Sequence, residues 1–461
     1  MMQRVLAIAG LTWKAAFRYR LFWVLAALLV GAVVVLPLLI KDDGTARGFT
    51  QILMTYTLSA ITGLLGIATL WLACGTLARD IEEAQIQMVA VKPIARWQIW
   101  IGKWLGIISL NALLLAIAGG SVFFLLQWRA NRLSPDQQSI LRNEVLVARA
   151  GVKEVIPDFS NAVEAELQRR LQSSAVNPTN VPAMRKQIED QVKAGIQSIR
   201  PDGYRPWRIE LGNARKSLRD QPLFLRIKFF AAENNPMGAF TTLWQVGNPE
   251  TKKFWRSEPM SHAAETFHEF PIPPNLFDEH GTLEIVFANP NQMTLLFPLE
   301  DGLEVLYRES GFGLNFTRGL GIILCWLTLL AALGLAAASF LSFPVAAFVS
   351  LAVLIMGLSS GTLTSVVEEG TILGVDHETG IADGKSVLDF VMVPFFRAFL
   401  KVINLVQGFS PIDSLSTGRS ITWATLGLAF GQIVLLLGGI LAAIGIITLT
   451  RRELATAQGN S

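Results

Sequence analysis

Long apolar runs separated by short charged segments occupy both ends of the chain. Six such runs can be recognised: Leu21–Ile40, Ile52–Leu77, Ile107–Leu126, Leu320–Phe340, Val345–Leu363 and Leu426–Leu449. Each is close to the roughly 20 apolar residues that a helix needs to cross a bilayer. The pattern therefore predicts an α-helical polytopic membrane protein with six transmembrane helices. The first three occupy residues 21–128, and the last three occupy residues 318–461.

The polar middle of the chain, residues 129–317, predicts a folded α+β domain on the outer side, inserted between helices 3 and 4. Its first part, residues 135–200, has helical character in three segments, and Asn177-Pro178 and Val181-Pro182 divide them into a hairpin or short bundle. These segments are 144–156 (EVLVARAGVKEVI), 161–174 (NAVEAELQRRLQSS) and 183–199 (AMRKQIEDQVKAGIQSI).

The second part of this middle region, residues 204–310, alternates apolar and polar positions with the two-residue period of strands. The clearest stretches are Leu223–Phe230, Thr241–Val246, Thr282–Ala288 and Leu303–Tyr307. Strands of this length and spacing predict a β-sandwich, of which a jelly roll is one form. Two interpretations of its large aromatic residues stay open, a ligand-binding outer face or the core of the sandwich. These aromatic residues are Trp207, Trp244, Trp255 and Tyr307.

The termini and one late segment have amphipathic or basic character. Residues 1–20 mix apolar with basic positions and predict an elbow helix in the cytoplasmic headgroup layer. Basic residues there and at Arg451-Arg452 predict that both termini are cytoplasmic. Residues 366–423 form a second outer segment, in which Val387–Val406 predicts an interfacial or re-entrant helix.

The amino-acid composition supports a membrane protein and argues against a nucleic-acid partner, a disulfide-stapled outer domain and a metal site. Hydrophobic residues make up 51% of the 461 residues and charged residues only 16%, as expected for a membrane protein. The net charge of +3 is small, so no nucleic-acid partner is predicted. Cys74 and Cys325 both lie in apolar runs, which excludes a disulfide-stapled outer domain. The spacing of His262, His268 and His280 matches no metal-binding motif, and we predict no metal site.

The loop at residues 78–104 separates the second and third apolar runs and is dense in charge. Lys92, Arg96 and Lys103 indicate a cytoplasmic face. Residues 79–91 predict a surface helix, Pro93 a turn, and the next helix restarts near Arg96. The loop is therefore either a handle on which a cytosolic partner acts or an ordinary basic anchor loop.

Three motifs of this loop resemble the ABC-2 type of ABC-transporter permease. They are Arg79-Asp80-Ile81-Glu82-Glu83, Lys92-Pro93-Ile94-Ala95-Arg96 and Ile101-Gly102-Lys103-Trp104. The turn at 340–346 (FLSFPVA) and the ending at 449–454 (LTRREL) are also similar to that family. The resemblance implies a coupling helix that docks on an ABC ATP-binding subunit. The implied coupling residues are Arg79, Asp80, Glu82, Glu83, Lys92, Pro93, Arg96 and Lys103.

No nucleotide-binding loop accompanies these motifs. The nearest candidate, Gly380–Ser386, places three residues between its glycines where a phosphate loop needs four. We therefore predict that the chain is not an enzyme and holds no cofactor, and that a partner binds ATP and Mg. The apolar runs contain almost no ionisable residues, which argues against an ion-coupled carrier.

The predicted function is thus a permease subunit in a bacterial inner membrane, paired with a second permease copy or a paralogue and driven by a separate ATPase. Two alternatives remain. One is a mechanotransmitter that passes ATP-driven motion to an outer partner. The other is a non-transporting anchor that displays a carbohydrate- or protein-binding sandwich. The expected contacts are the lipid membrane and an outer polysaccharide or accessory protein.

Overall fold

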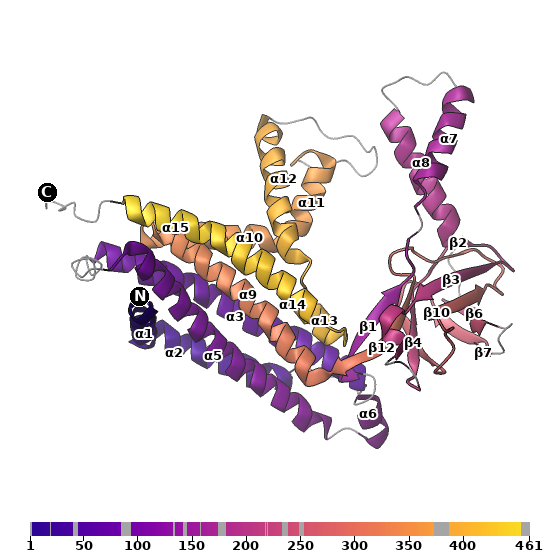
Figure 1. The fold of residues 1–461 in the computed structure, drawn as a ribbon, viewed down its shortest axis with the longest axis horizontal. Helices are drawn as coiled ribbons and strands as arrows, with labels where there is room; N and C mark the ends of the chain where they lie inside the picture. Colours follow the sequence, from indigo (N-terminus) through magenta and orange to yellow (C-terminus); the bar gives the residue numbers. More distant parts are fainter. Residues whose placement is uncertain are drawn as a thin grey trace. The chain divides into compact units, whose positions relative to one another are not determined.

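The computed structural model describes residues 2–18, 20–39, 45–83, 94–131, 134–141, 145–156, 158–173, 181–216, 218, 220–232, 238–248, 253–372 and 387–452. These residues form two compact units. One comprises Met1–Val147 and Gly311–Ser461 and is helical, whereas Ala148–Ser310 is built mainly of strands (Figure 1).

The helical unit contains both amphipathic and strongly apolar helices. They are α1 (Met2–Arg18), α2 (Arg20–Leu39), α3 (Ala46–Glu82), α5 (Arg96–Ala130), α6 (Pro135–Ile140), α9 (Phe312–Ala338), α10 (Phe343–Leu358), α11 (Ser360–Glu369), α12 (Val387–Gln407), α13 (Pro411–Ser416), α14 (Trp423–Ala429), the π-helix η5 (Phe430–Gly438) and α15 (Gly439–Arg451). The stretch from α14 through η5 to α15 is continuous (Figure 1).

Four helices in the described ranges are long and apolar enough to cross a membrane. They cover Thr50–Glu82, Arg96–Ala130, Phe312–Ala338 and Trp423–Arg451. A fifth span results if α10 and α11 are counted together, although they are bent by 68° at their junction. In α2 the described apolar stretch is only Ala26–Val35, shorter than the roughly 20 residues of a spanning helix. The described residues therefore contain four or five helices that could span a membrane, and six spans are not confirmed.

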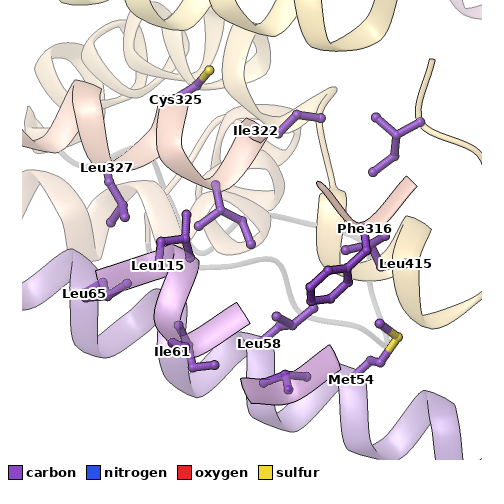
Figure 2. Close-up of a cluster of buried hydrophobic side chains, with 14 of the residues drawn as sticks. Met54, Leu58, Ile61, Leu65, Leu115, Phe316, Ile322, Cys325, Leu327 and Leu415 are labelled. Carbon is purple, nitrogen blue, oxygen red and sulfur yellow. The ribbon is translucent and has the colours of Figure 1, made fainter. Parts of the chain in front are cut away.

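The core of the helical unit lies where α3 meets α5 and α9. One face of α3 carries apolar residues at helical spacing, and these are almost fully buried: Met54, Leu58, Ile61 and Leu65. They form one buried cluster with Leu115 of α5 and with Phe316 and Ile322 of α9 (Figure 2). Apolar residues at this spacing line up on one side of a helix, so the sequence pattern of α3 determines which face packs inward.

The N-terminal amphipathic helix α1 packs closely on α5. Its buried side includes Ile8 and Thr12, and it faces Gly102 and Gly106 of α5. A β-carbon on Gly102 would lie 2.7 Å from Ile8 Cβ, and one on Gly106 would lie 2.8 Å from Thr12 Cβ. Only glycine permits this approach, as in other small-xxx-small helix pairs. The predicted elbow helix is thus confirmed as a helix, and one of its faces is occupied by α5.

In the described residues, the strand-rich unit consists of three sheets and a helical hairpin. Its elements are β1 (Val147–Lys153), α7 (Ser160–Ser173), α8 (Val181–Gln197), β2 (Ser198–Ile199), β3 (Tyr204–Glu210), the 3-10 helix η3 (Gly212–Lys216), β4 (Leu223–Ile227), β5 (Phe230–Ala231), β6 (Ala239–Asn248), β7 (Lys253–Arg256), β8 (Met260–Ala263), β9 (His268–Ile272), β10 (Thr282–Ala288), β11 (Leu295–Leu296) and β12 (Leu303–Gly311). The sheet orders are β1-β12-β4-β9, β3-β10-β6-β7 with β8 also on β6, and β2-β11-β5.

A shared apolar core joins these sheets, with Leu225 of β4, Val246 of β6 and Ile285 of β10 fully buried in it. The prediction of a β-rich domain is therefore confirmed, whereas the jelly roll is not. The predicted hairpin between residues 161 and 199 is confirmed as α7 and α8, which pack through Val163, Leu167 and Ile188.

The helix predicted over residues 144–156 is wrong, because most of this segment is strand β1. Its valines favour extended backbone, and β12 supplies the partner strand. The strand predicted over Leu223–Phe230 is also divided. Its last residue belongs to β5, which pairs with β11 in another sheet.

We predict that Gly102→Ala and Gly106→Ala destabilise the protein by about 1–3 kcal/mol, because the added methyl group overpacks the contact between α1 and α5. Thermal unfolding of the full chain in detergent would measure the effect. Gly120→Ala in the same helix is the matched control. Nothing lies within 4 Å of a β-carbon there, so it should be neutral or stabilising by up to about 1 kcal/mol. Equal effects at all three positions would contradict the packing argument.

Candidate coupling site at the helix ends

Lys103 of α5 stabilises the C-terminal end of α3. Its Nζ lies 2.5 Å from Asp80 Oδ2 and donates to the Thr76 carbonyl at 2.7 Å. The Lys103 side chain is only 9% exposed, so burial of its charge is offset by the carboxylate and the carbonyl. A cation also complements the partial negative charge at a helix C-terminus. The two long helices that flank residues 84–93 are therefore joined by a partly buried ion pair, in which the Asp80 side chain is 32% exposed.

Glu82, in the last turn of α3, stabilises the start of α10. Its Oε1 accepts a hydrogen bond from the Phe343 amide at 2.9 Å. The first amides of a helix have no partner within that helix, and Ser342 at the N-cap supplies no side-chain hydrogen bond. Arg79 lies over the Phe343 ring, with 4.6 Å from its Cζ to the ring centroid. Two residues of the predicted coupling motif thus hold the turn between α9 and α10.

Arg96, the first residue of α5, caps the C-terminal end of α15. Its Nη1 donates to the carbonyls of Leu449, Thr450 and Arg452 at 2.8, 2.8 and 2.7 Å. Arg452 in turn donates to the Ser339 carbonyl at the end of α9, at 3.2 Å. Asp80, Glu82, Arg96, Lys103 and Arg452, named here the helix-end cluster, therefore link the ends of α3, α5, α9, α10 and α15.

Of the remaining predicted coupling residues, the structure describes Glu83 but not Lys92 or Pro93. Glu83 is the exposed C-cap residue of α3, and its amide donates to the Arg79 carbonyl at 2.8 Å. Lys92 and Pro93 lie outside the described residues, as does the rejected phosphate-loop candidate Gly380–Ser386.

The expected surface helix over residues 79–91 is tested only over its first residues, because residues 84–91 lie outside the described ones. Residues 79–82 form the last turn of α3, because no glycine or proline follows Gly75 until Pro93 and nothing ends the helix at Leu77. The restart of helix at Arg96 is confirmed.

One pair of polar side chains, Asn111 and Thr69, joins two of the long helices. Asn111 of α5 donates to the Thr69 hydroxyl of α3 at 2.8 Å, and Thr69 donates to the Leu65 carbonyl. Because both groups of this pair have partners, the packing role that small polar residues have between helices accounts for them.

The aromatic residues of the strand-rich unit divide between core and surface. Trp207 and Trp244 are 3% and 1% exposed and pack on each other with ring centroids 6.0 Å apart. These two are core residues and present no ligand face. Trp255 and Tyr307 are only partly buried against the same cluster, and ligand binding by them stays a prediction.

His262 and His268 lie side by side at β8 and β9, with ring centroids 4.5 Å apart. His262 Nδ1 is 2.9 Å from the Thr242 hydroxyl, and His268 Nε2 is 2.7 Å from the Ala263 carbonyl. Within the described ranges, no three His, Cys, Asp or Glu side chains are placed to hold a metal ion. Burial, and secondly the neighbouring His268, lower the pKa of His262 from 6.5 to about 4.

Sequence reasoning used Arg451-Arg452 for the topology and for the family resemblance, and missed that Arg452 caps α9. A basic residue near a helix C-terminus is a general signal for such capping, although the sequence does not say which helix is capped.

Comparison of the chain with protein-family models, curated proteins and solved structures finds no match.

We predict that Arg96→Met frays the end of α15, because three carbonyls lose a charged donor. The free energy of local opening should fall by about 1–3 kcal/mol, measured as faster amide hydrogen exchange in the last turn of α15. Arg397→Met, at an exposed position on α12, is the control and should leave this exchange unchanged. Unaltered exchange in Arg96→Met would show that the cap does not stabilise α15.

A second prediction concerns pH. The folded state disfavours protonated His262, so the stability that the neutral side chain provides is complete above about pH 6.5 and is lost as the pH falls from 6.5 toward 4. Hydrogen exchange of β8 and β9 in the full chain should therefore accelerate over that interval. His262→Gln should remove most of this pH dependence, and an unchanged profile would contradict the assignment.

Proposed function

We propose that this chain is the membrane-embedded permease subunit of an ABC transporter of the ABC-2 type. A separate ATP-binding subunit would act on the segment that joins α3 to α5. The observation that carries the proposal is the helix-end cluster, in which Glu82 and Arg96, on either side of that segment, bind the ends of two other helices, α10 and α15. The four or five apolar helices are compatible with a membrane-embedded chain.

A displacement of this segment would reach distant parts of the helical unit through short hydrogen bonds. Glu82 connects the end of α3 to α10, and Arg96 connects the start of α5 to α15. Hydrogen bonds of charged groups are stronger than those between neutral groups; the Arg96 bond to Leu449 is partly buried, whereas the Glu82 bond to Phe343 is exposed. A force that the ATP-binding subunit applies to this segment would therefore shift α10 and α15 relative to the helices between them. Switching proteins transmit motion through rigid helices in this way.

A second permease copy is part of the proposal. Apolar side chains are exposed along α10, η5 and α15, among them Phe348, Leu435 and Ile440. Such surfaces need lipid or another apolar partner. The sequence offers no phosphate loop, so the nucleotide and its Mg would be bound by the separate ATPase.

The proposal predicts that the full-length chain, isolated gently from its own cells, brings an ABC ATP-binding subunit with it in fixed stoichiometry. Quantitative mass spectrometry of the affinity-purified complex would measure this. Recovery of an outer partner together with the ATPase would favour a mechanotransmitter. Repeated isolation with no ATPase would favour a membrane anchor and would refute the permease assignment.

In the same complex, Glu82→Lys should reduce ATP hydrolysis at least about tenfold. The change places a cation against the positive end of α10 and removes the Phe343 cap, at a cost of about 1–3 kcal/mol. Arg169→Glu, on the exposed surface of α7 with a side chain 78% exposed, is the charge-reversal control. Equal turnover in wild type and Glu82→Lys complexes of equal composition would exclude a coupling role for the helix-end cluster.

A further inference from the structure

The start of α9 binds the segment that precedes α14, at the end of α9 opposite the helix-end cluster. Asn315, fully buried, donates to the Arg419 carbonyl at 2.8 Å and accepts from the Ile421 amide at 2.7 Å. One turn further along, Arg318 donates to the Ile421 carbonyl at 2.8 Å. Two neighbouring polar side chains thus use both backbone groups of Ile421.

Arg318 is a buried cation without a counterion in the described part of the chain. The residue is only 6% exposed, and it makes one hydrogen bond, to Ile421, and one ring contact, with Cζ 4.8 Å from the Trp423 ring centroid. Its Nε is buried and has no partner among the described residues. A guanidinium carries several N–H donors, and a buried charge is costly unless it is paired.

The polar groups next to Arg318 also indicate that an anion binds here. The Ser420 hydroxyl, adjacent to Ile421, is a second buried polar atom for which the described residues provide no partner. The one acid of α13, Asp413, accepts from the Ser410 hydroxyl. The Arg318 Nε and the Ser420 hydroxyl are both hydrogen-bond donors, and a phosphate oxygen is an acceptor that suits each of them.

The surroundings indicate where this anion comes from. Trp423, whose ring covers the guanidinium, is 61% exposed, and tryptophan is enriched where helices pass through the headgroup layer. α9 and the stretch from Trp423 to Arg451 are both apolar enough to span a membrane, and their ends meet here. A group that reaches this position from the bilayer is therefore a lipid headgroup.

We propose that Arg318, with Ser420 and Trp423 beside it, binds the phosphodiester group of a membrane phospholipid. The guanidinium supplies paired donors that match two phosphate oxygens, the Ser420 hydroxyl donates to the same phosphate, and the Trp423 ring packs against the glycerol region. The bound lipid completes the contact between the start of α9 and the segment before α14. This site is independent of the coupling role proposed above.

The test compares wild type, Arg318→Gln, Arg318→Lys and the exposed control Arg397→Gln, each as the full chain delipidated in a maltoside detergent. Each is titrated with phosphatidylglycerol, phosphatidylcholine, diacylglycerol of the same acyl chains, or inorganic phosphate. Both phospholipids should raise the thermal midpoint of wild type and of Arg397→Gln by roughly 2–4 °C above diacylglycerol. Arg318→Gln should lose this difference, while Arg318→Lys, which keeps the charge, should retain part of it.

Three outcomes would overturn the proposal. In the first, diacylglycerol stabilises wild type as much as the phospholipids do, so that the phosphate is irrelevant. In the second, Arg318→Gln and Arg318→Lys both fold and respond to phospholipid like wild type. In the third, inorganic phosphate alone gives the full shift, which identifies a soluble anion as the ligand. Native mass spectrometry should also show one retained phospholipid fewer in Arg318→Gln than in Arg397→Gln.

Discussion

The backbone groups at the ends of long apolar helices need hydrogen-bond partners, and in this protein charged side chains from other helices supply them. Glu82 serves the start of α10, Arg96 the end of α15 and Arg452 the end of α9, while Lys103 pairs with the Asp80 side chain near the end of α3. Lipid cannot replace these partners. The requirement therefore joins helices that are distant in sequence and makes their ends mechanically dependent on one another.

Close helix packing brings the backbone groups at the helix ends within reach of these side chains. A β-carbon on Gly334 of α9 would lie 2.7 Å from Ala73 Cβ of α3, and one on Gly445 of α15 would lie 2.6 Å from Trp100 Nε1 of α5. Trp100 is one turn after Arg96, so its packing on α15 brings Arg96 to the end of that helix. Packing and capping thus depend on each other, because loss of either increases the distance that the other must span.

The two ends of α9 differ in the charged side chains around them and in the groups that these side chains bind. At its C-terminal end, the helix-end cluster contains both signs of charge, and its cations bind carbonyls and a carboxylate of the chain itself. At its N-terminal end, Arg318 binds one carbonyl and is covered by Trp423. Buried ionisable groups near membrane helices commonly mark functional sites. The first end is the place where we propose that force is transmitted within the protein, and the second is the place where we propose that a phospholipid binds.

Sequence alone determined where the long apolar helices lie, that α5 restarts at Arg96, and that Thr282–Ala288 is a strand, since hydropathy, proline and two-residue alternation act locally. It also located the charged residues of the helix-end cluster. Only the tertiary structure decided what they bind, because Glu82 and Phe343 are 261 residues apart and Arg96 and Leu449 are 353 apart. The burial of Trp207 and Trp244 was decided in the same way, since core and surface aromatics share one local pattern and differ only in what packs against them.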